Sequence, residues 1–199
     1  MAERASRKQT TPPIEDAIPN ILLIGLRGSG KSTIGAALAE SIEHQFIDLD
    51  VVTLWRLRCA TVEEAWREQG VPRFRAAEAE GLRSALDNPE RVIAAGGGTP
   101  TAPGAAEAIR THQERNDLFV VYLRGAPAAL RSRLESLAAD PNRPSITGDG
   151  MLDEIDEVYH DRDPLYCELA DEIINLSADA AQIVQEIQAR VRDMQNSKS

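Results

Sequence analysis

The residues best suited to chemistry begin with a glycine-rich stretch, GLRGSGKS, which runs from Gly25 to Ser32. Glycines in such a loop let successive backbone N–H groups turn inward around a phosphate, at the positive end of the helix that follows. Lys31 can reach the β- and γ-phosphates, and the hydroxyl of Ser32 can bind Mg²⁺. An apolar run precedes the loop and an amphipathic helical pattern follows it, which is the context this motif requires. The stretch therefore predicts that the chain binds a nucleoside triphosphate.

Two carboxylates, Asp48 and Asp50, end the next apolar run in the sequence FIDLD. In a parallel α/β sheet, the carboxyl ends of the strands converge on the ligand crevice. Alternate residues of a strand share a face, so we expect both carboxylates to point into one site. One can hold Mg²⁺ through water while the other accepts or orients a substrate hydroxyl. Acidic residues after a strand also cap helices, but the phosphate-binding loop one helix earlier favours the functional interpretation.

A third candidate is the glycine triplet Gly96 to Gly98, in the sequence IAAGGGTP. Each glycine gives up more backbone freedom on folding than any other residue, so three together are costly. Glycine triplets also occur in plain loops. Because this one follows an apolar run, we expect it to end a strand beside the crevice, where a side chain would occupy the space that a substrate needs.

The elements that must position these residues alternate in type along the chain. From Asn20 onward, short apolar runs alternate with helical patterns, which is typical of a parallel sheet wrapped by helices. We expect strands at about 21–24, 45–49, 92–95, 118–123 and 172–176. Apolar spacing predicts helices after the first strand, over about 127–137 and from about residue 177 onward.

The region after the acidic pair carries clear helix boundaries. Thr61 and Glu64 have the spacing of a capping box, which predicts a helix that begins there and ends near Gly70. Pro72 then suits the first turn of the next helix. Further on, residues 138–150 read AADPNRPSITGDG, which is polar and rich in proline, glycine and aspartate. A loop of this length is either a passive connection or a functional lid, and we expect a lid.

Length and composition bound the alternatives. A chain of 199 residues with 42% hydrophobic and 27% charged residues is ordinary for one soluble domain with a proper core. The formal net charge of −10 argues against nucleic acid or an anionic membrane surface as the main partner, because both select basic faces. The two cysteines show no paired motif, which suits a reducing compartment, and no segment has the apolar length to span a bilayer. We expect a cytoplasmic monomer with a flexible polar tail at 1–19 and a second tail at 193–199.

Six motifs of this chain resemble, in order and spacing, those of the shikimate kinase family: GLRGSGKST, DLD, FRAAE, GGGT, NRPS and RDPLY. The resemblance covers roughly residues 20 to 192. It implies a P-loop kinase related in fold to nucleoside monophosphate kinases, with three α/β/α layers and a five-stranded parallel sheet in the order 2-3-1-4-5. It also implies one kinase domain over 20–192, with a substrate-binding helical region at about 50–86 and a lid at about 138–150.

The resemblance further implies an activity and the residues that carry it. The family transfers the γ-phosphoryl group of ATP to the 3-hydroxyl of shikimate, a step toward chorismate and the aromatic amino acids. The implied ATP-binding residues are Gly28, Ser29, Gly30, Lys31, Ser32, Thr33, Arg133 and Arg143, and the implied Mg²⁺ ligands are Ser32 and Asp48. The implied shikimate-binding residues are Asp50, Arg75, Gly96, Gly97, Gly98 and Arg162. The implied catalytic residues are Lys31, Asp50 and Arg143.

By motif position, Arg75 and Arg162 bind the shikimate carboxylate, Asp50 meets the ring hydroxyls, and the last two glycines of the triplet present N–H groups. The residue types agree with these roles, because a small carboxylate-bearing polyol needs a fixed positive fork and arginine supplies one. Glu78 stands three residues after Arg75 on a predicted helix, so it can hold that guanidinium in place. An ordinary exposed ion pair is the alternative for these two residues taken alone.

On the nucleotide side, the resemblance places Arg133 near the adenine and Arg143 on the lid over the phosphates. Phosphoryl transfer depends mainly on positioning and charge neutralisation. Lys31, Mg²⁺ and an arginine from a closing lid of the same chain provide both.

Two other functions compete with this one. A gluconate kinase or nucleotide kinase would share the architecture, but Arg75, Arg162 and the glycine triplet speak against it. A non-catalytic, ATP-binding regulatory module is suggested by the lid sequence RPSI, where the family has Arg-Pro followed by two aliphatic residues. Against that module stands the presence of all five residues expected at the phosphate and metal site: Lys31, Ser32, Asp48, Asp50 and Arg143.

Overall fold

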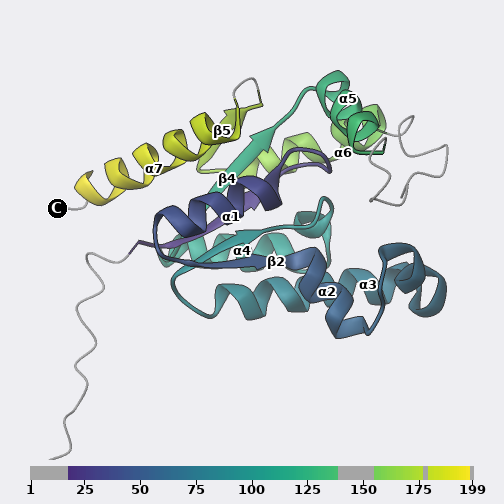
Figure 1. Cartoon of the computed structure of the whole chain (residues 1–199). Helices are drawn as coiled ribbons and strands as arrows, with labels where there is room; N and C mark the ends of the chain where they lie inside the picture. Colours follow the sequence, from purple (N-terminus) through teal and green to yellow (C-terminus); the bar gives the residue numbers. More distant parts are fainter. Residues whose placement is uncertain (1–17, 139–154, 177–178, 198–199) are drawn as a thin grey trace, which may run out of the picture.

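The computed structural model describes residues 18–138, 155–176 and 179–197, which form a parallel sheet with helices on both faces (Figure 1). In chain order the elements are β1 (Asn20–Ile24), α1 (Lys31–Ser41), β2 (Gln45–Asp48), α2 (Leu49–Leu57), α3 (Val62–Leu86), β3 (Arg91–Ala94), the short 3-10 helix η2 (Thr99–Thr101), α4 (Ala105–Glu114), β4 (Leu118–Arg124), α5 (Pro127–Ala138), α6 (Ile155–Leu169), β5 (Glu172–Asn175) and α7 (Ala180–Ser197). None of the described helices is both long and apolar enough to cross a membrane.

The sheet has the predicted order, β2-β3-β1-β4-β5, and each pair of neighbouring strands is parallel. β1 lies at the centre, where Ile21 pairs with Val92 of β3 and with Phe119 of β4. Because the strands are parallel, their carboxyl ends lie at one edge of the sheet. That edge carries the phosphate-binding loop after β1 and the glycine triplet after β3.

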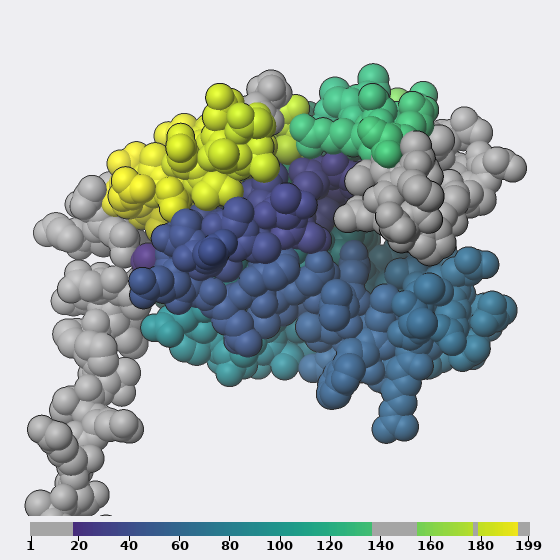
Figure 2. Space-filling view, in the orientation of Figure 1, coloured from purple at the N-terminus to yellow at the C-terminus, as the bar shows by residue number. Residues whose placement is uncertain are grey.

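Two apolar cores, one on each face, hold the sheet between its helices. Alternate residues of β1 supply them: Ile21 and Leu23 enter one core, while Leu22 and Ile24 enter the other. On the first face α1 and α7 pack against each other and lie side by side in Figure 2. Helices α3, α4 and α6 cover the second face. A sheet buried on both faces is a rigid platform, and the functional groups stand on its edge.

The helical region after β2 forms a lobe with a small core of its own, made by Leu57, Cys59, Ala65, Phe74 and Ala77. The predicted cap at Thr61 is present, because its Oγ1 accepts from the N–H of Glu64 at 3.1 Å. Glu64 Oε2 in turn accepts from the N–H of Ala60 at 2.6 Å. Gly70, at φ 78°, kinks α3 where the first helix was expected to end. The backbone of Gly70 is non-helical (φ 78°, ψ 154°), so α3 consists of two helices that meet at this residue, and the predicted division is confirmed.

The prediction that Asp48 and Asp50 share one face of a strand is wrong. β2 ends at Asp48, one residue earlier than expected, and Leu49 begins α2. The Oδ1 atom of Asp48 caps this helix by accepting from the N–H groups of Asp50 at 3.0 Å and Val51 at 3.4 Å. An aspartate that bonds the backbone ahead of it favours a helix start over a continued strand. Asp50 thus lies on the first turn of α2.

Candidate active site

The loop between β1 and α1 has the backbone geometry that phosphate binding requires. Gly28 and Gly30 have φ angles of 82° and 86°, in the left-handed region that side chains disfavour. Gly30 is also the N-cap of α1 and provides no side-chain cap. The first N–H groups of α1 are therefore available to an anion at the positive end of the helix.

Lys31, the first residue of α1, folds back into this loop. Its Nζ donates to the carbonyl oxygens of Gly25 at 2.9 Å and Leu26 at 3.0 Å, and to Ser29 Oγ at 3.3 Å. Burial lowers the pKa of Lys31 from 10.5 to about 8, and two nearby carboxylates oppose that shift. The ammonium group is thus charged at neutral pH, and the loop itself satisfies its donors.

Asp48 joins the phosphate-binding loop to α2. Its Oδ2 accepts from Ser32 Oγ at 2.7 Å, while its Oδ1 caps the helix. Hydroxyl and carboxylate oxygens are the hard ligands that Mg²⁺ takes, and two from the protein suffice when water and phosphate fill the other positions. The described part of the chain contains no cluster of three or more His, Cys, Asp or Glu side chains that would hold a metal. The donor set fits a Mg²⁺ ion shared with phosphate.

Asp50 lies between the phosphate-binding loop and the glycine triplet. A Cβ atom at Gly96 would overlap its Oδ1, so the carboxylate rests directly on that backbone. Desolvation raises the pKa of Asp50, Lys31 lowers it, and the charges of Asp48 and Glu78 raise it further. Asp50 is nevertheless an exposed residue. The result is an accessible carboxylate whose affinity for a proton is higher than usual.

A buried carboxylate anchors Arg75. Arg75 Nη1 donates to Glu78 Oε2 at 2.6 Å, and Thr99 Oγ1 donates to Glu78 Oε1 at 3.0 Å. The Glu78 side chain is 2% exposed, whereas that of Arg75 is 24% exposed. Both oxygens of the buried carboxylate are satisfied, and the guanidinium keeps further N–H donors for a ligand. The predicted contact between Arg75 and Glu78 is present, and it is not an ordinary exposed helix pair.

The glycine triplet is crowded by the protein itself. A Cβ atom at Gly98 would come within 2.9 Å of Arg75 Cζ, and one at Gly96 would come within 2.9 Å of Glu78 Oε1. We expected the space beside the triplet to belong to the substrate. Instead, the side chains of Asp50 and Arg75 fill it at two of the three positions. Glycine is required here because it lets these groups lie directly on the backbone at the end of β3.

The carbonyl oxygen of Gly97 joins the triplet to α6. It accepts from Arg162 Nη1 at 2.7 Å and from the Tyr166 hydroxyl at 2.8 Å. Burial raises the pKa of Tyr166 to about 12, while the charges of Arg162 and Arg75 lower it, so both guanidinium groups lie near one hydroxyl. Among the described residues, no hydrogen-bond partner occupies the N–H groups of Gly97 and Gly98. Their binding to the substrate stays a prediction.

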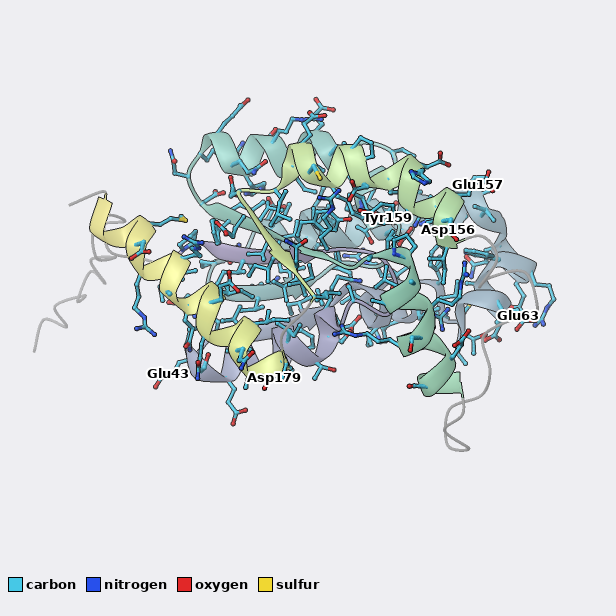
Figure 3. The ribbon with its side chains drawn as sticks, turned by 90° about the horizontal axis from the view of Figure 1, so that it is seen from above. Glu43, Glu63, Asp156, Glu157, Tyr159 and Asp179 are labelled. Atoms are coloured by element: carbon cyan, nitrogen blue, oxygen red, sulfur yellow. The ribbon has the colours of Figure 1, made fainter. Side chains whose placement is uncertain are left out.

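A groove of about 440 Å³ opens beside the phosphate-binding loop. Its lining residues are Gly28, Gly30, Thr33, Ile34, Arg133, Ser136, Asp179, Ala180 and Ile183. They come from the loop, α1, α5 and the start of α7, where Figure 3 labels Asp179. Arg133 therefore lies in the same groove as the loop glycines. Apolar walls with a few polar groups suit a planar base.

The predicted site is otherwise brought together at one edge of the sheet. Arg143 and the predicted lid lie outside the described residues, apart from Ala138 at the end of α5. Two residues that the sequence did not single out are Thr99, which holds Glu78, and Arg124, the last residue of β4. A signal existed for Arg124, since a charged residue at the carboxyl end of a central strand stands at the ligand-facing edge.

Solved structures place this fold among small P-loop kinases. A gluconokinase from Sinorhizobium meliloti 1021 matches with a TM-score of 0.57 and 20% identity, over 90% of this chain and 95% of its own, and shares the fold. A shikimate kinase from Acinetobacter baumannii, solved in complex with shikimate, matches with a TM-score of 0.76 and 28% identity, over 89% of this chain and 95% of its own.

Sequence comparison is more specific. The family model for shikimate kinase matches residues 27–192. Shikimate kinase 2 from Escherichia coli O1:K1 / APEC is 36% identical over 169 residues, which cover 85% of this chain and 93% of that protein. The chain belongs to the shikimate kinase family, and the resemblance carried by the six motifs is confirmed.

Proposed function

We propose that this chain transfers the γ-phosphoryl group of ATP to the 3-hydroxyl of shikimate, giving shikimate 3-phosphate and ADP. The observation that carries the proposal is the convergence of Arg75 and Arg162 on the glycine triplet, beside Asp50. Two guanidinium groups bind a carboxylate in a fixed orientation, and the neighbouring carboxylate then receives a ring hydroxyl. Family membership and the match to a relative solved with shikimate support the same acceptor.

On the acceptor side, Arg75 and Arg162 bind the carboxylate of shikimate, and the N–H groups of Gly97 and Gly98 donate to the substrate. Asp50 accepts a hydrogen bond from the 3-hydroxyl. As that oxygen attacks the γ-phosphorus, the bond from phosphorus to the bridging oxygen of ADP breaks and the hydroxyl proton passes to Asp50. The raised pKa of Asp50 supports this role, because a general base works best when its pKa approaches the working pH.

On the nucleotide side, the adenine occupies the groove that Arg133 lines, and the phosphates lie in the loop from Gly28 to Thr33. Lys31 exchanges its bonds to the loop carbonyls for bonds to the β- and γ-phosphates. Ser32 and Asp48 would hold Mg²⁺, which would supply positive charge beside the phosphate oxygens. The protein then contributes little covalent chemistry to the transfer, which depends on how ATP and the acceptor are positioned.

The remaining parts of the proposal concern organisation. The segment at about 138–150 acts as a lid that brings Arg143 over the phosphates. The chain works as a cytoplasmic monomer, with one kinase domain over 20–192 and tails at its two ends.

Identification of the phosphorylated product tests the proposal. The chain is incubated with ATP and Mg²⁺ and, in separate reactions, shikimate, gluconate or a nucleoside monophosphate, and phosphorus NMR identifies the new ester. We expect a single monoester at the 3-oxygen of shikimate. Phosphorylation of gluconate or the nucleotide alone would assign a different kinase, and ATP binding without transfer to any acceptor would assign a regulatory module.

A further inference from the structure

A hydrogen-bonded network lies directly behind Arg162 and has no role in the function proposed above. Asp163, the next residue, accepts from Arg124 Nε at 2.8 Å through Oδ1 and from Arg124 Nη2 at 2.7 Å through Oδ2. The buried Tyr122 hydroxyl donates to the same Oδ1 at 2.8 Å. Arg124 Nε also donates to the hydroxyl of Tyr159, which Figure 3 labels on α6, at 3.1 Å. The network therefore links the end of β4 to α6.

The geometry of this network constrains the orientation of Asp163 more than a surface ion pair would. The Asp163 side chain is 14% exposed, and its two oxygens meet the guanidinium fork of Arg124 in parallel. Burial raises the pKa of Asp163, but hydrogen bonds from Arg124 and Tyr122 outweigh burial and lower the pKa overall. A two-pronged contact fixes orientation as well as distance, which a single lysine-type contact does not.

Helix α6 is thereby attached to the sheet edge at two points within one turn. Arg162 and Tyr166 both donate to the carbonyl of Gly97, and Asp163 binds the end of β4. Pro164 follows Asp163 inside the helix and removes one backbone N–H donor from this turn. A turn with a weakened backbone ladder depends more on its side-chain attachments. Without the two-pronged contact of Arg124, a single hydrogen bond from Tyr122 would be left between Asp163 and β4, and α6 could turn about its contact with Gly97 and carry Arg162 with it.

We propose that Arg124 is a positioning residue for Arg162: through Asp163 it fixes the rotation of α6 and with it the guanidinium that receives the acceptor carboxylate. This inference rests on the proposed function, because it concerns the arginine assigned to that carboxylate. Arg124 itself contacts no substrate in this scheme. Its effect should therefore act on the acceptor and pass through Arg162 alone.

Steady-state kinetics of the full chain test this inference through Arg124→Met, Arg162→Met and the double variant. We expect Arg124→Met to raise the KM for shikimate about tenfold and to leave the KM for ATP within about twofold, an effect of the size typical of residues in one hydrogen-bond network. In the Arg162→Met background the same substitution should add nothing. Arg124→Lys keeps the charge without the fork and should fall between wild type and Arg124→Met.

Arg110→Met is the matched control. Arg110 binds Glu168 at 2.6 Å, an exposed pair that also ties α6 to a neighbouring element, and its loss should leave both KM values unchanged.

If Arg124→Met folds poorly because Asp163 loses its charged partner, Asp163→Asn removes the charged contact with a smaller disturbance and should show the same selective rise in KM. Kinetics of Arg124→Met and Asp163→Asn that match Arg110→Met, or losses that are equal with and without Arg162, would overturn the inference. A wild-type chain with no shikimate-dependent turnover would instead overturn the proposed function and this inference with it.

Discussion

The two halves of the crevice are built by different means. The phosphate half is one continuous stretch, GLRGSGKS, in which glycine conformations and the start of α1 arrange backbone N–H groups. The acceptor half draws single side chains from α2, α3, η2 and α6, and holds them by pairs such as Arg75 with Glu78. The first half depends on local backbone geometry, whereas the second depends on how distant elements pack. Substitutions in the two halves should therefore affect different substrates.

The largest expected effect comes from Asp50, where the two halves meet. We expect Asp50→Ala to lower kcat by about 10²- to 10⁴-fold, since that is what a positioned general base contributes. ATP affinity, measured by calorimetry, should stay nearly unchanged because the phosphate loop is intact. Asp50→Asn keeps the size of the side chain but cannot take a proton, so it should be equally impaired. Near-normal turnover in either variant would remove Asp50 from its assigned role.

The next largest expected effect is confined to the acceptor half of the crevice. Arg75→Ala should weaken shikimate binding by about 2–5 kcal/mol, because it removes one guanidinium partner of the shikimate carboxylate. The KM for ATP should stay unchanged in this variant. Arg73→Ala is the control, because Arg73 lies on the same helix in an exposed pair with Glu80 at 3.2 Å. Equal kinetics in these two variants would contradict the carboxylate-binding role of Arg75.

In the phosphate half, Lys31 should affect the free energy of unfolding as well as activity. Its pKa is lowered from 10.5 to about 8 in the folded chain, so the charged form costs stability at neutral pH and this cost disappears as pH rises from about 8 to 10.5. Lys31→Met should be inactive. Its unfolding free energy at pH 7 should nevertheless exceed that of wild type by up to about 3 kcal/mol. The gain is reduced by the stability that is lost when the loop carbonyls no longer accept hydrogen bonds from Lys31. Thermal unfolding from pH 7 to 10.5 should show this gap narrowing, and a gap independent of pH would contradict the account.

The same contrast explains what the sequence could predict. The alternation of strands and helices, the glycine conformations of the phosphate loop and the cap at Thr61 depend on apolar periodicity and local turn chemistry, and these were predicted correctly. The strand order was implied by the resemblance to the shikimate kinase family, and it is confirmed. The place of Asp50 was not, because the cap at Asp48 ended the strand one residue early. The bond between Arg124 and Asp163 joins residues 39 positions apart, and no local pattern encodes it. Pairings of this kind are set by tertiary packing.

The smallest expected effect changes the stability of the helical lobe after β2 and leaves the kinetics unchanged. Arg58 is the C-cap that follows α2, at φ 56°, in the left-handed region where a side chain is strained and glycine is favoured. Arg58→Gly should raise the unfolding free energy by about 0.5–1 kcal/mol, measured by urea denaturation, and leave both KM values unchanged. A changed KM for shikimate would mean that the end of α2 influences the acceptor site.

A coupled assay that follows ADP release from ATP and Mg²⁺, with and without shikimate, tests the assigned acceptor most directly. We expect release that depends on shikimate and saturates with it, since the acceptor half must be filled before transfer. Release that ignores shikimate, or none at all while ATP still binds, would contradict the assignment of Arg75, Arg162 and Asp50 to this acceptor.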